Sequence, residues 1–223
     1  MGPPKTFASG TLSALTLDMG EKHVAVVVLS PHVDDEVLGC FSFLSSHCHV
    51  VYGGIEDRPS IAVRTAELLE SSEALGFSHE ELSQPVNEFS PTALLPQFEA
   101  IINERRPTTV LIPAPSYNQD HRAFHEAGLI AVRPHDQNHR VDRVLLYEQP
   151  HSMIWPLQHD TFQPSVFAPI DVEAKIVAYQ RYASQVRGHR SPDTVRALAE
   201  LRGAHIGEPA AEAFELRRQV VNP

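Results

Sequence analysis

Short apolar runs that alternate with helix-like stretches constrain the fold of this chain more than any other feature. The run that begins at His23 and ends at Leu29 is β-branched and apolar almost throughout, which is typical of a strand buried on both faces. Similar runs cover 48–52, 108–112 and 141–147. Apolar residues recur at helical spacing in six other stretches: 59–76, 91–105, 121–133, 171–187, 192–202 and 209–218. This alternation predicts an α/β fold with a mostly parallel, Rossmann-like sheet and helices on both faces.

The organisation of the chain favours one domain. Its 223 residues are enough to bury a sizeable core, and no repeat period or linker divides them. Residues 1–22 are rich in Gly, Ser, Thr and Pro and are expected to form an irregular lead-in. We therefore expect a single domain over residues 1–223.

Composition argues against two classes of partner. A net charge of -10 argues against nucleic-acid binding, which needs a basic surface. No stretch approaches the ~20 apolar residues of a membrane span, and residues 1–20 lack the long apolar core of a signal peptide. The expected location is therefore the cytoplasm. The count of thirteen histidines is high, which directs the search toward metal ligands.

The first group of chemically capable residues follows the first predicted strand, in the segment Pro-His-Val-Asp-Asp-Glu at 31–36. In an open parallel sheet, ligands bind outside the carboxyl ends of the strands. His32 and Asp35 are three residues apart at a tight turn, so an imidazole nitrogen and a carboxylate oxygen can meet on one ion. Asp34 would point elsewhere and hold a water, as zinc-dependent hydrolysis requires. By itself, however, the segment is better explained as an acidic helix start beside a loop histidine.

A second strand-to-helix junction supplies the missing ligand. The predicted strand at 108–112 is followed by a loop that ends in Asp120 and His121. In a parallel sheet this loop opens at the same edge as the first one. Two histidines and one carboxylate, with room for water, form a recognised catalytic zinc ligand set. The two junctions together therefore predict a metal site.

The other histidines do not share this pattern. His125 lies four residues after His121, but no Glu follows His121, so the pair is not the His-Glu-x-x-His signature of metalloproteases. His125 is expected to be structural or peripheral. The remaining histidines show no ligand spacing and are expected to be mostly solvated: His47, His49, His79, His135, His139, His151, His159, His189 and His205.

These motifs resemble those of the zinc-dependent N-acetylglucosamine deacetylases of the PIG-L/LmbE type. Residues 31–36 are similar to the family's (A/P)HPDDE motif, and Asn-Gln-Asp-His at 118–121 is similar to its HxDH motif. The similarity extends over most of the chain, from about residue 23 to 218. It includes Arg64-x-x-Glu67, Tyr147-Glu148, residues 175–185 and residues 202–214.

The resemblance implies a reaction and a metal. The reaction would be hydrolysis of an N-acetyl or similar N-acyl group from an amino sugar or an amino-sugar conjugate. The metal would be Zn²⁺, with Fe²⁺ as an alternative, held by His32, Asp35 and His121. Family members often form trimers or hexamers, so a homo-oligomer is also implied.

The resemblance further implies roles for residues around the metal. Asp34 would be the general base that deprotonates the metal-activated water and returns the proton to the leaving amine. Asp120 would orient an imidazole ring. Arg64 would lie near the sugar and bind substrate.

Two residues depart from the family pattern. Val33 replaces the usual proline, which loosens the turn slightly. Asn118 stands where the family commonly has a histidine that stabilises the oxyanion. An asparagine can donate a hydrogen bond to an oxyanion but cannot deliver a proton. We therefore expect Asp34 alone to shuttle the proton, with Asn118 or Tyr117 assisting the oxyanion.

Three other functions are alternatives to deacetylation. One is a different small-molecule amidase on the same scaffold, and another is a metal- or sugar-binding protein without catalysis. A Rossmann-type cofactor enzyme is rejected, because no glycine-rich phosphate turn follows the first predicted strand. The substrate remains open, since the expected pocket walls lie in loops: residues 56–58, Tyr117 and 149–155, the last of which includes Trp155.

Overall fold

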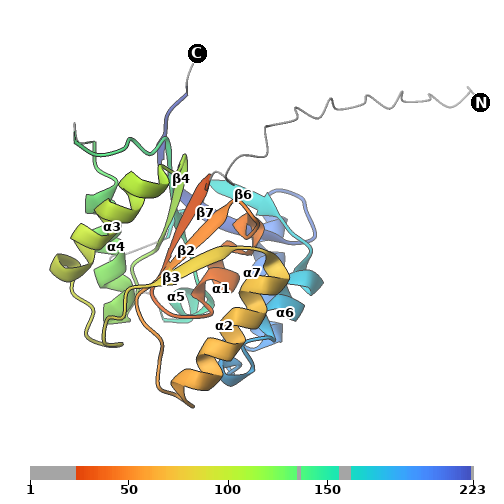
Figure 1. Cartoon of the computed structure of the whole chain (residues 1–223). Helices are drawn as coiled ribbons and strands as arrows, with labels where there is room; N and C mark the ends of the chain where they lie inside the picture. The colour runs from red at the N-terminus through yellow and green to blue at the C-terminus, as the bar shows by residue number, and fades with distance from the viewer. Residues whose placement is uncertain (1–23, 135–136, 156–161, 222–223) are drawn as a thin grey trace, which may run out of the picture.

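The computed structural model describes residues 24–134, 137–155 and 162–221. These residues include a seven-stranded sheet. The strand order is β3-β2-β1-β4-β5-β7-β6 (Figure 1). The strands are β1 (Val26–Ser30), β2 (Cys48–Tyr52), β3 (Ser78–Glu81), β4 (Thr109–Pro113), β5 (Arg143–Tyr147), β6 (Val166–Pro169) and β7 (Ala211–Gln219). Strands β1 to β5 pair in parallel, whereas β7 runs antiparallel to both of its neighbours. The predicted mostly parallel α/β sheet is confirmed. The expected lead-in at 1–22 lies outside the described residues.

Helices cover both faces of the sheet, as predicted (Figure 1). One face packs against α3 (Pro91–Arg105) and α4 (Gln119–Ala131). The other packs against α1 (Asp35–Cys40), α2 (Ile61–Leu75), α6 (Val172–Tyr179) and α7 (Pro192–Ala204). A short helix, α5 (Pro150–Ile154), and two 3-10 turns, η1 (Phe41–Phe43) and η2 (Ala183–Gln185), complete the described elements.

The first strand, β1, shows why its sequence is apolar without alternation as far as Leu29. Val27 and Leu29 pack into the core under α3 and α4, while Val28 packs into the core on the opposite face. Successive side chains of a strand point to opposite faces. A strand with helices on both sides therefore needs apolar residues without alternation.

The centre of the sheet positions the site. Strands β1 and β4 are neighbours in the sheet, but the chain leaves β1 for α1 on one face and leaves β4 for α4 on the other. The strand order reverses at such a point, which opens a crevice beyond the carboxyl ends of the two strands. The loops that carry His32 and His121 both enter this crevice.

One predicted element is wrong. Residues 209–218 were expected to be helical, but 211–219 form strand β7, which pairs with β5 on one side and β6 on the other. The segment is rich in Ala and Glu, which favour helices in isolation. Two neighbouring strands satisfy its backbone groups, and Phe214 is fully buried in the core. Tertiary pairing therefore outweighs local propensity.

A second predicted helix is longer than the helix in the structure. The helix expected over 171–187 ends at Tyr179 in α6, and a separate turn at 183–185 follows. The change of direction buries Tyr182 and Gln185 and leads the chain back toward the crevice. The strands β3 and β6 and the short helix α5 were not predicted. No residue of β3 or β6 is fully buried, so these strands lack the pattern by which the central strands were found.

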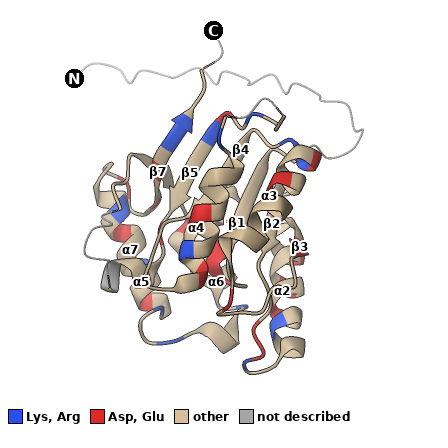
Figure 2. Cartoon of the chain, turned by 90° about the vertical axis from the view of Figure 1, so that its left-hand side faces the viewer, with Lys and Arg blue, Asp and Glu red and all other residues tan. Residues whose placement is uncertain are grey.

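No helix among the described residues is long and apolar enough to cross a membrane. On the side of the molecule formed by α3 and α4, Lys and Arg positions are scattered among Asp and Glu positions (Figure 2). This distribution agrees with the acidic net charge of the chain.

Candidate active site

The loop between β1 and α1 is fixed by contacts to its own backbone. The Asp35 carboxylate accepts a hydrogen bond from the His32 backbone N–H at 3.0 Å. The Glu36 carboxylate accepts one from the Asp34 backbone N–H, also at 3.0 Å. All of these residues are buried. The turn therefore presents the side chains of His32, Asp34 and Asp35 in set directions.

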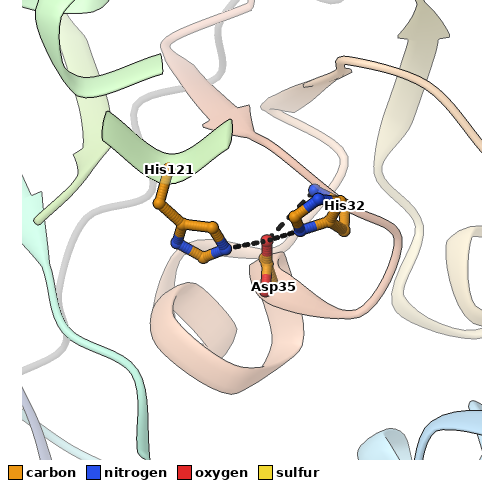
Figure 3. Close-up of side chains that lie close together, drawn as sticks. All are labelled: His32, Asp35 and His121. Carbon is orange, nitrogen blue, oxygen red and sulfur yellow. Dashed lines mark hydrogen bonds and ion pairs between the residues drawn. The ribbon is translucent and has the colours of Figure 1, made fainter. Parts of the chain in front are cut away.

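Three side chains from the two loops converge, as the sequence predicted. Asp35 Oδ2 lies 3.3 Å from His32 Nδ1 and 3.2 Å from His121 Nε2. One donor atom from each of the three residues lies within 4.8 Å of the others. Figure 3 shows the carboxylate of Asp35 between the two rings, with His121 reaching in from α4. We refer to these three residues as the His-Asp-His cluster.

Asp120 fastens one ring of the cluster. His32 Nε2 donates to Asp120 Oδ2 at 2.9 Å, and the backbone N–H groups of Asn87 and Phe89 donate to the same carboxylate at 2.7 and 3.3 Å. Burial opposes ionisation of Asp120, but the bond from His32 and these N–H groups lowers its pKa. A proton held on Nε2 leaves the Nδ1 lone pair of His32 directed at Asp35. The expected orienting role of Asp120 thus has a geometric basis.

The donor set of the cluster fits a divalent transition metal. Burial would raise the pKa of Asp35, but His121 and His32 hold it well below its usual range, so an anionic oxygen faces two imidazoles. Lone pairs on three atoms that face one another in a buried site repel each other, and a cation bound between them would relieve this repulsion. Two histidines and one carboxylate with open positions suit zinc or ferrous iron.

Asp34 differs from its neighbours in backbone and in contacts. Its φ of 115° lies in the left-handed region. This backbone conformation is strained for a non-glycine residue, and such strained residues are concentrated at functional sites. Oδ2 accepts from Arg190 Nη1 at 2.9 Å. Oδ1 is buried and makes no hydrogen bond within the described part of the chain. Burial raises the pKa of Asp34 to about 6, although Arg190 opposes the shift.

A polar cavity of about 180 Å³ opens beside the cluster. Asp34 and the three residues of the cluster form its floor. Its walls come from loops and helix ends: Glu56, Tyr117, Asn118, His151, Gln185, Arg187, His189 and Arg190. A cavity of this volume holds many waters, because a single water needs roughly 10–15 Å³ by the same measure.

The expected pocket walls are present in part. Glu56 and Tyr117 line the cavity, and Trp155 lies near it, with its ring centroid 6.1 Å from that of Tyr117. Asn118 lines the cavity too, but its side-chain oxygen accepts from the Asp120 N–H at 2.8 Å and so caps α4. That contact was not anticipated for Asn118.

Arg64 does not lie where a substrate-binding residue was expected. It is 1% exposed and does not line the cavity described above. Its guanidinium donates to Glu67 at 3.0 Å, to Ser184 at 3.3 Å and to the carbonyl of Val33. Through its bond to the Val33 carbonyl, Arg64 contacts the turn that follows His32.

Two residues of the site were given no role by sequence reasoning, although His151 lies in the expected wall segment 149–155. His151 was expected to be solvated, but it is 8% exposed, and its ring centroid lies 4.9 Å from that of His121. Burial lowers the pKa of His151 to about 3, and His121 adds to the effect. Arg190 contacts Asp34 from a segment beyond α6. Neither residue is marked by a motif: His151 lies in the short helix α5, and Arg190 lies in the segment between η2 and α7.

The sequence matches no protein-family model and no curated protein, whereas the fold matches solved structures over most of the chain. The N,N'-diacetylchitobiose deacetylase of Pyrococcus horikoshii is 21% identical with a TM-score of 0.68, over 86% of this chain and 82% of that one. A zinc-inhibited form of teicoplanin deacetylase Orf2 is 18% identical with a TM-score of 0.66, over 85% and 96%.

A third similar structure catalyses a different reaction. The 4-carboxy-2-hydroxymuconate hydratase GalB of Pseudomonas putida KT2440 is 20% identical with a TM-score of 0.66, over 89% of this chain and 98% of that one. At such identities the likeness concerns the fold. The chain therefore has the fold that solved N-deacetylases share with this hydratase.

Proposed function

We propose that this protein is a metal-dependent hydrolase that removes an N-acetyl or similar N-acyl group from an amino sugar or an amino-sugar conjugate. The observation that carries the proposal is the carboxylate of Asp34, which lines the cavity beside the His-Asp-His cluster and has one buried oxygen without a hydrogen bond among the described residues. The deacetylases with the same fold support it, as does the resemblance of residues 31–36 and 118–121 to deacetylase motifs.

His32, Asp35 and His121 would hold the metal, with zinc as the first choice and ferrous iron as the alternative. A bound metal of this kind acts as a Lewis acid that polarises a carbonyl and acidifies water. Asp120 would keep the His32 ring in its tautomer and orientation, which raises the basicity of a metal-binding imidazole.

Asp34 would be the general base and then the general acid. Its Oδ1 would take a proton from the attacking water as the new C–O bond forms at the acyl carbon. The electrons of the carbonyl double bond move to its oxygen, and their return breaks the C–N bond. Asp34 would then pass the proton to the departing nitrogen, which leaves as the amine. Arg190, bonded to Oδ2 at 2.9 Å, would keep Oδ1 pointed at the substrate.

The cavity walls suit a polar substrate. Glu56, Arg187 and His189 offer hydrogen bonds to hydroxyl groups. Tyr117 is 47% exposed and Trp155 is 71% exposed, so their rings offer flat apolar faces at the rim of the cavity. Such a combination of polar groups and aromatic rings suits a sugar ring, which has polar edges and apolar faces.

The decisive experiment measures acetate release from a panel of N-acetylated amino sugars and their conjugates by the zinc-loaded protein. The Asp34→Asn variant serves as the control. We expect it to retain metal but to lose activity by about 100- to 10,000-fold, as is usual when a general base is removed. Release of acetate by the variant at the wild-type rate would contradict the role of Asp34.

The same panel separates the alternatives. Release of a longer acyl acid or of acid from an acylated antibiotic, without acetate release from sugars, would favour a different amidase. Metal binding with no turnover of any amide would favour a binding protein. A hydratase has the same fold, so consumption of a substrate does not by itself show amide hydrolysis. The assay must therefore identify the product.

A further inference from the structure

The imidazole of His151 is built into the site without being part of the His-Asp-His cluster. It comes from α5, which follows β5, and its ring stands edge-on to His121 with centroids 4.9 Å apart and planes at 83°. It lines the same cavity as Asp34. At 8% exposure, it is held in place by the surrounding side chains.

One hydrogen bond of His151 is compatible with a ring proton on Nδ1. Its Nε2 lies 3.2 Å from the Ser116 hydroxyl. That hydroxyl oxygen accepts from the Asn118 backbone N–H at 3.2 Å, and its own proton can be donated to His151 Nε2. In that tautomer the ring carries its proton on Nδ1. This nitrogen makes no hydrogen bond to any residue that the structure describes.

The site needs such a donor. In amide hydrolysis the carbonyl oxygen gains negative charge, and pre-positioned N–H groups that meet this charge are a large source of rate enhancement. The side-chain oxygen of Asn118 caps α4, so only its amide nitrogen is left to meet this charge. The neighbouring ring of Tyr117 packs edge-on against His151, at 5.5 Å and 70°, and is itself half exposed.

We infer that His151 is a catalytic residue that donates its Nδ1–H to the developing oxyanion, a role that rests on the proposed amide hydrolysis. In the tautomer in which Nε2 accepts from Ser116, the neutral imidazole offers its Nδ1–H. His151 would thus supply an oxyanion contact from a different element than the one that carries Asn118.

The test compares His151→Phe, which keeps a ring but has no donor, with His151→Gln, which keeps an N–H donor but cannot transfer a proton. For His151→Phe we expect kcat to fall about 100- to 1000-fold, the usual loss for one oxyanion donor, with KM and metal content nearly unchanged. For His151→Gln we expect part of that loss to be recovered. A Gln variant as slow as the Phe variant would overturn the donor role.

A second measurement does not depend on turnover. A phosphonamidate that mimics the tetrahedral intermediate should lose affinity for His151→Phe by the same factor as kcat/KM, because both report binding of the transition state. Unchanged affinity for this analogue would overturn the inference. The same substitution at His79, a partly buried histidine on β3 with Tyr52 and Phe77 as ring neighbours, controls for general effects of replacing histidine.

The two proposals fail in different ways. If the wild-type protein neither hydrolyses an acetylated amino sugar nor binds the phosphonamidate, the proposed function fails and the role of His151 fails with it. If the wild-type protein does both and His151→Phe changes neither, the role of His151 alone is overturned.

Discussion

Asp120 joins the two loops of the site at the level of single atoms. It stands next to His121 in sequence, but its carboxylate bonds the ring of His32 and the backbone of Asn87 and Phe89. Three groups from two other parts of the chain therefore depend on this one side chain. A residue with this many buried partners is costly to remove.

We expect Asp120→Ala to weaken metal binding by about 10- to 100-fold, as is common when the hydrogen-bond partner of a metal-binding histidine is lost. The reason is that the ring of His32 would be free to rotate and to change tautomer. Competition with a chromogenic chelator measures the affinity. Glu88→Ala, an exposed carboxylate between Asn87 and Phe89, is the matched control and should leave the affinity as it is. Equal affinity in Asp120→Ala and wild type would contradict this role.

The sequence predicts the site well where side chains lie next to strand ends. His32, Asp35 and His121 follow buried strands directly, so the topology of a parallel sheet brings them together. His151 lies in the short helix α5, and Arg190 lies in the segment between η2 and α7. Their direction depends on packing, which spacing alone does not encode. Arg64 matches a family motif, yet its burial and partners make it a support for the loop.

At the scale of elements, β7 is held to α1 and α6 by a buried ion pair. Lys175 on α6 donates to Glu212 on β7 and to the Leu38 carbonyl, each at 2.7 Å. Glu212 also accepts from the backbone N–H groups of Phe41 and Ser42 at 2.9 and 2.8 Å. The charges are fully paired, although both side chains are nearly inaccessible to water.

We expect Glu212→Ala to lower the free energy of unfolding by about 3–5 kcal/mol, the usual cost of leaving one partner of a buried pair uncompensated. Denaturation in urea measures it. Glu173→Ala breaks an ion pair with Arg196 that also involves α6 but lies at the surface, so its effect should be much smaller. Similar losses in the two variants would show that the burial of Glu212 has no special consequence.

A histidine near the start of β2 is expected to make the pairing of β2 with β3 sensitive to pH. His49 is buried, and its ring bonds Ser78 and Glu80 at 2.9 and 2.8 Å. Burial lowers its pKa; Glu80 and Glu104 oppose the shift, and Arg105 adds to it. The folded protein therefore binds a proton at His49 less readily than the unfolded chain does.

The sign of the effect follows from this difference. Above the unfolded pKa of about 6.5, both states hold a neutral ring, and as the pH falls below it the unfolded chain takes up the proton first. Stability is thus lost on acidification. We expect His49→Gln to reduce the loss of unfolding free energy between pH 7.5 and pH 5, and the exposed His47→Gln to leave it unchanged. An equal loss in His49→Gln and wild type would contradict the assignment.

The type of an element was predictable where its local sequence pattern agrees with the contacts that it makes in the folded protein. The stretch 91–105 carries helical periodicity and forms α3 with the same bounds. The stretch 171–187 carries it too, yet the chain turns after Tyr179 because Tyr182 is buried with its hydroxyl bonded to Glu36. Strand β7 also differs from its local pattern, which predicted a helix. Long-range partners decide these elements, and a local pattern does not contain them.

At the scale of the whole molecule, the His-Asp-His cluster links the two halves of the sheet. His32 and Asp35 follow β1, and His121 follows β4. An ion bound to all three would hold both junctions in their folded arrangement. Any ligand that binds the folded state alone stabilises it.

We expect zinc at 100 times its dissociation constant to raise the free energy of unfolding by about 2.7 kcal/mol, and a chelator to reverse the gain. Urea denaturation with and without the metal measures this difference. His121→Ala removes one member of the cluster and should abolish most of the gain. A gain of the same size in His121→Ala would place the metal elsewhere in the molecule.

The position of β7 between β5 and β6 has a consequence for biosynthesis. In the described sheet β6 pairs with β7, although β6 comes first in the chain. While a ribosome is still translating residues 170–210, β6 has nothing to pair with, and the edge of β5 is open. Unpaired strand edges promote association between chains. A stop codon or a stall before residue 211 would therefore release a nascent polypeptide with two unprotected strands, which is a natural substrate for chaperones and proteases.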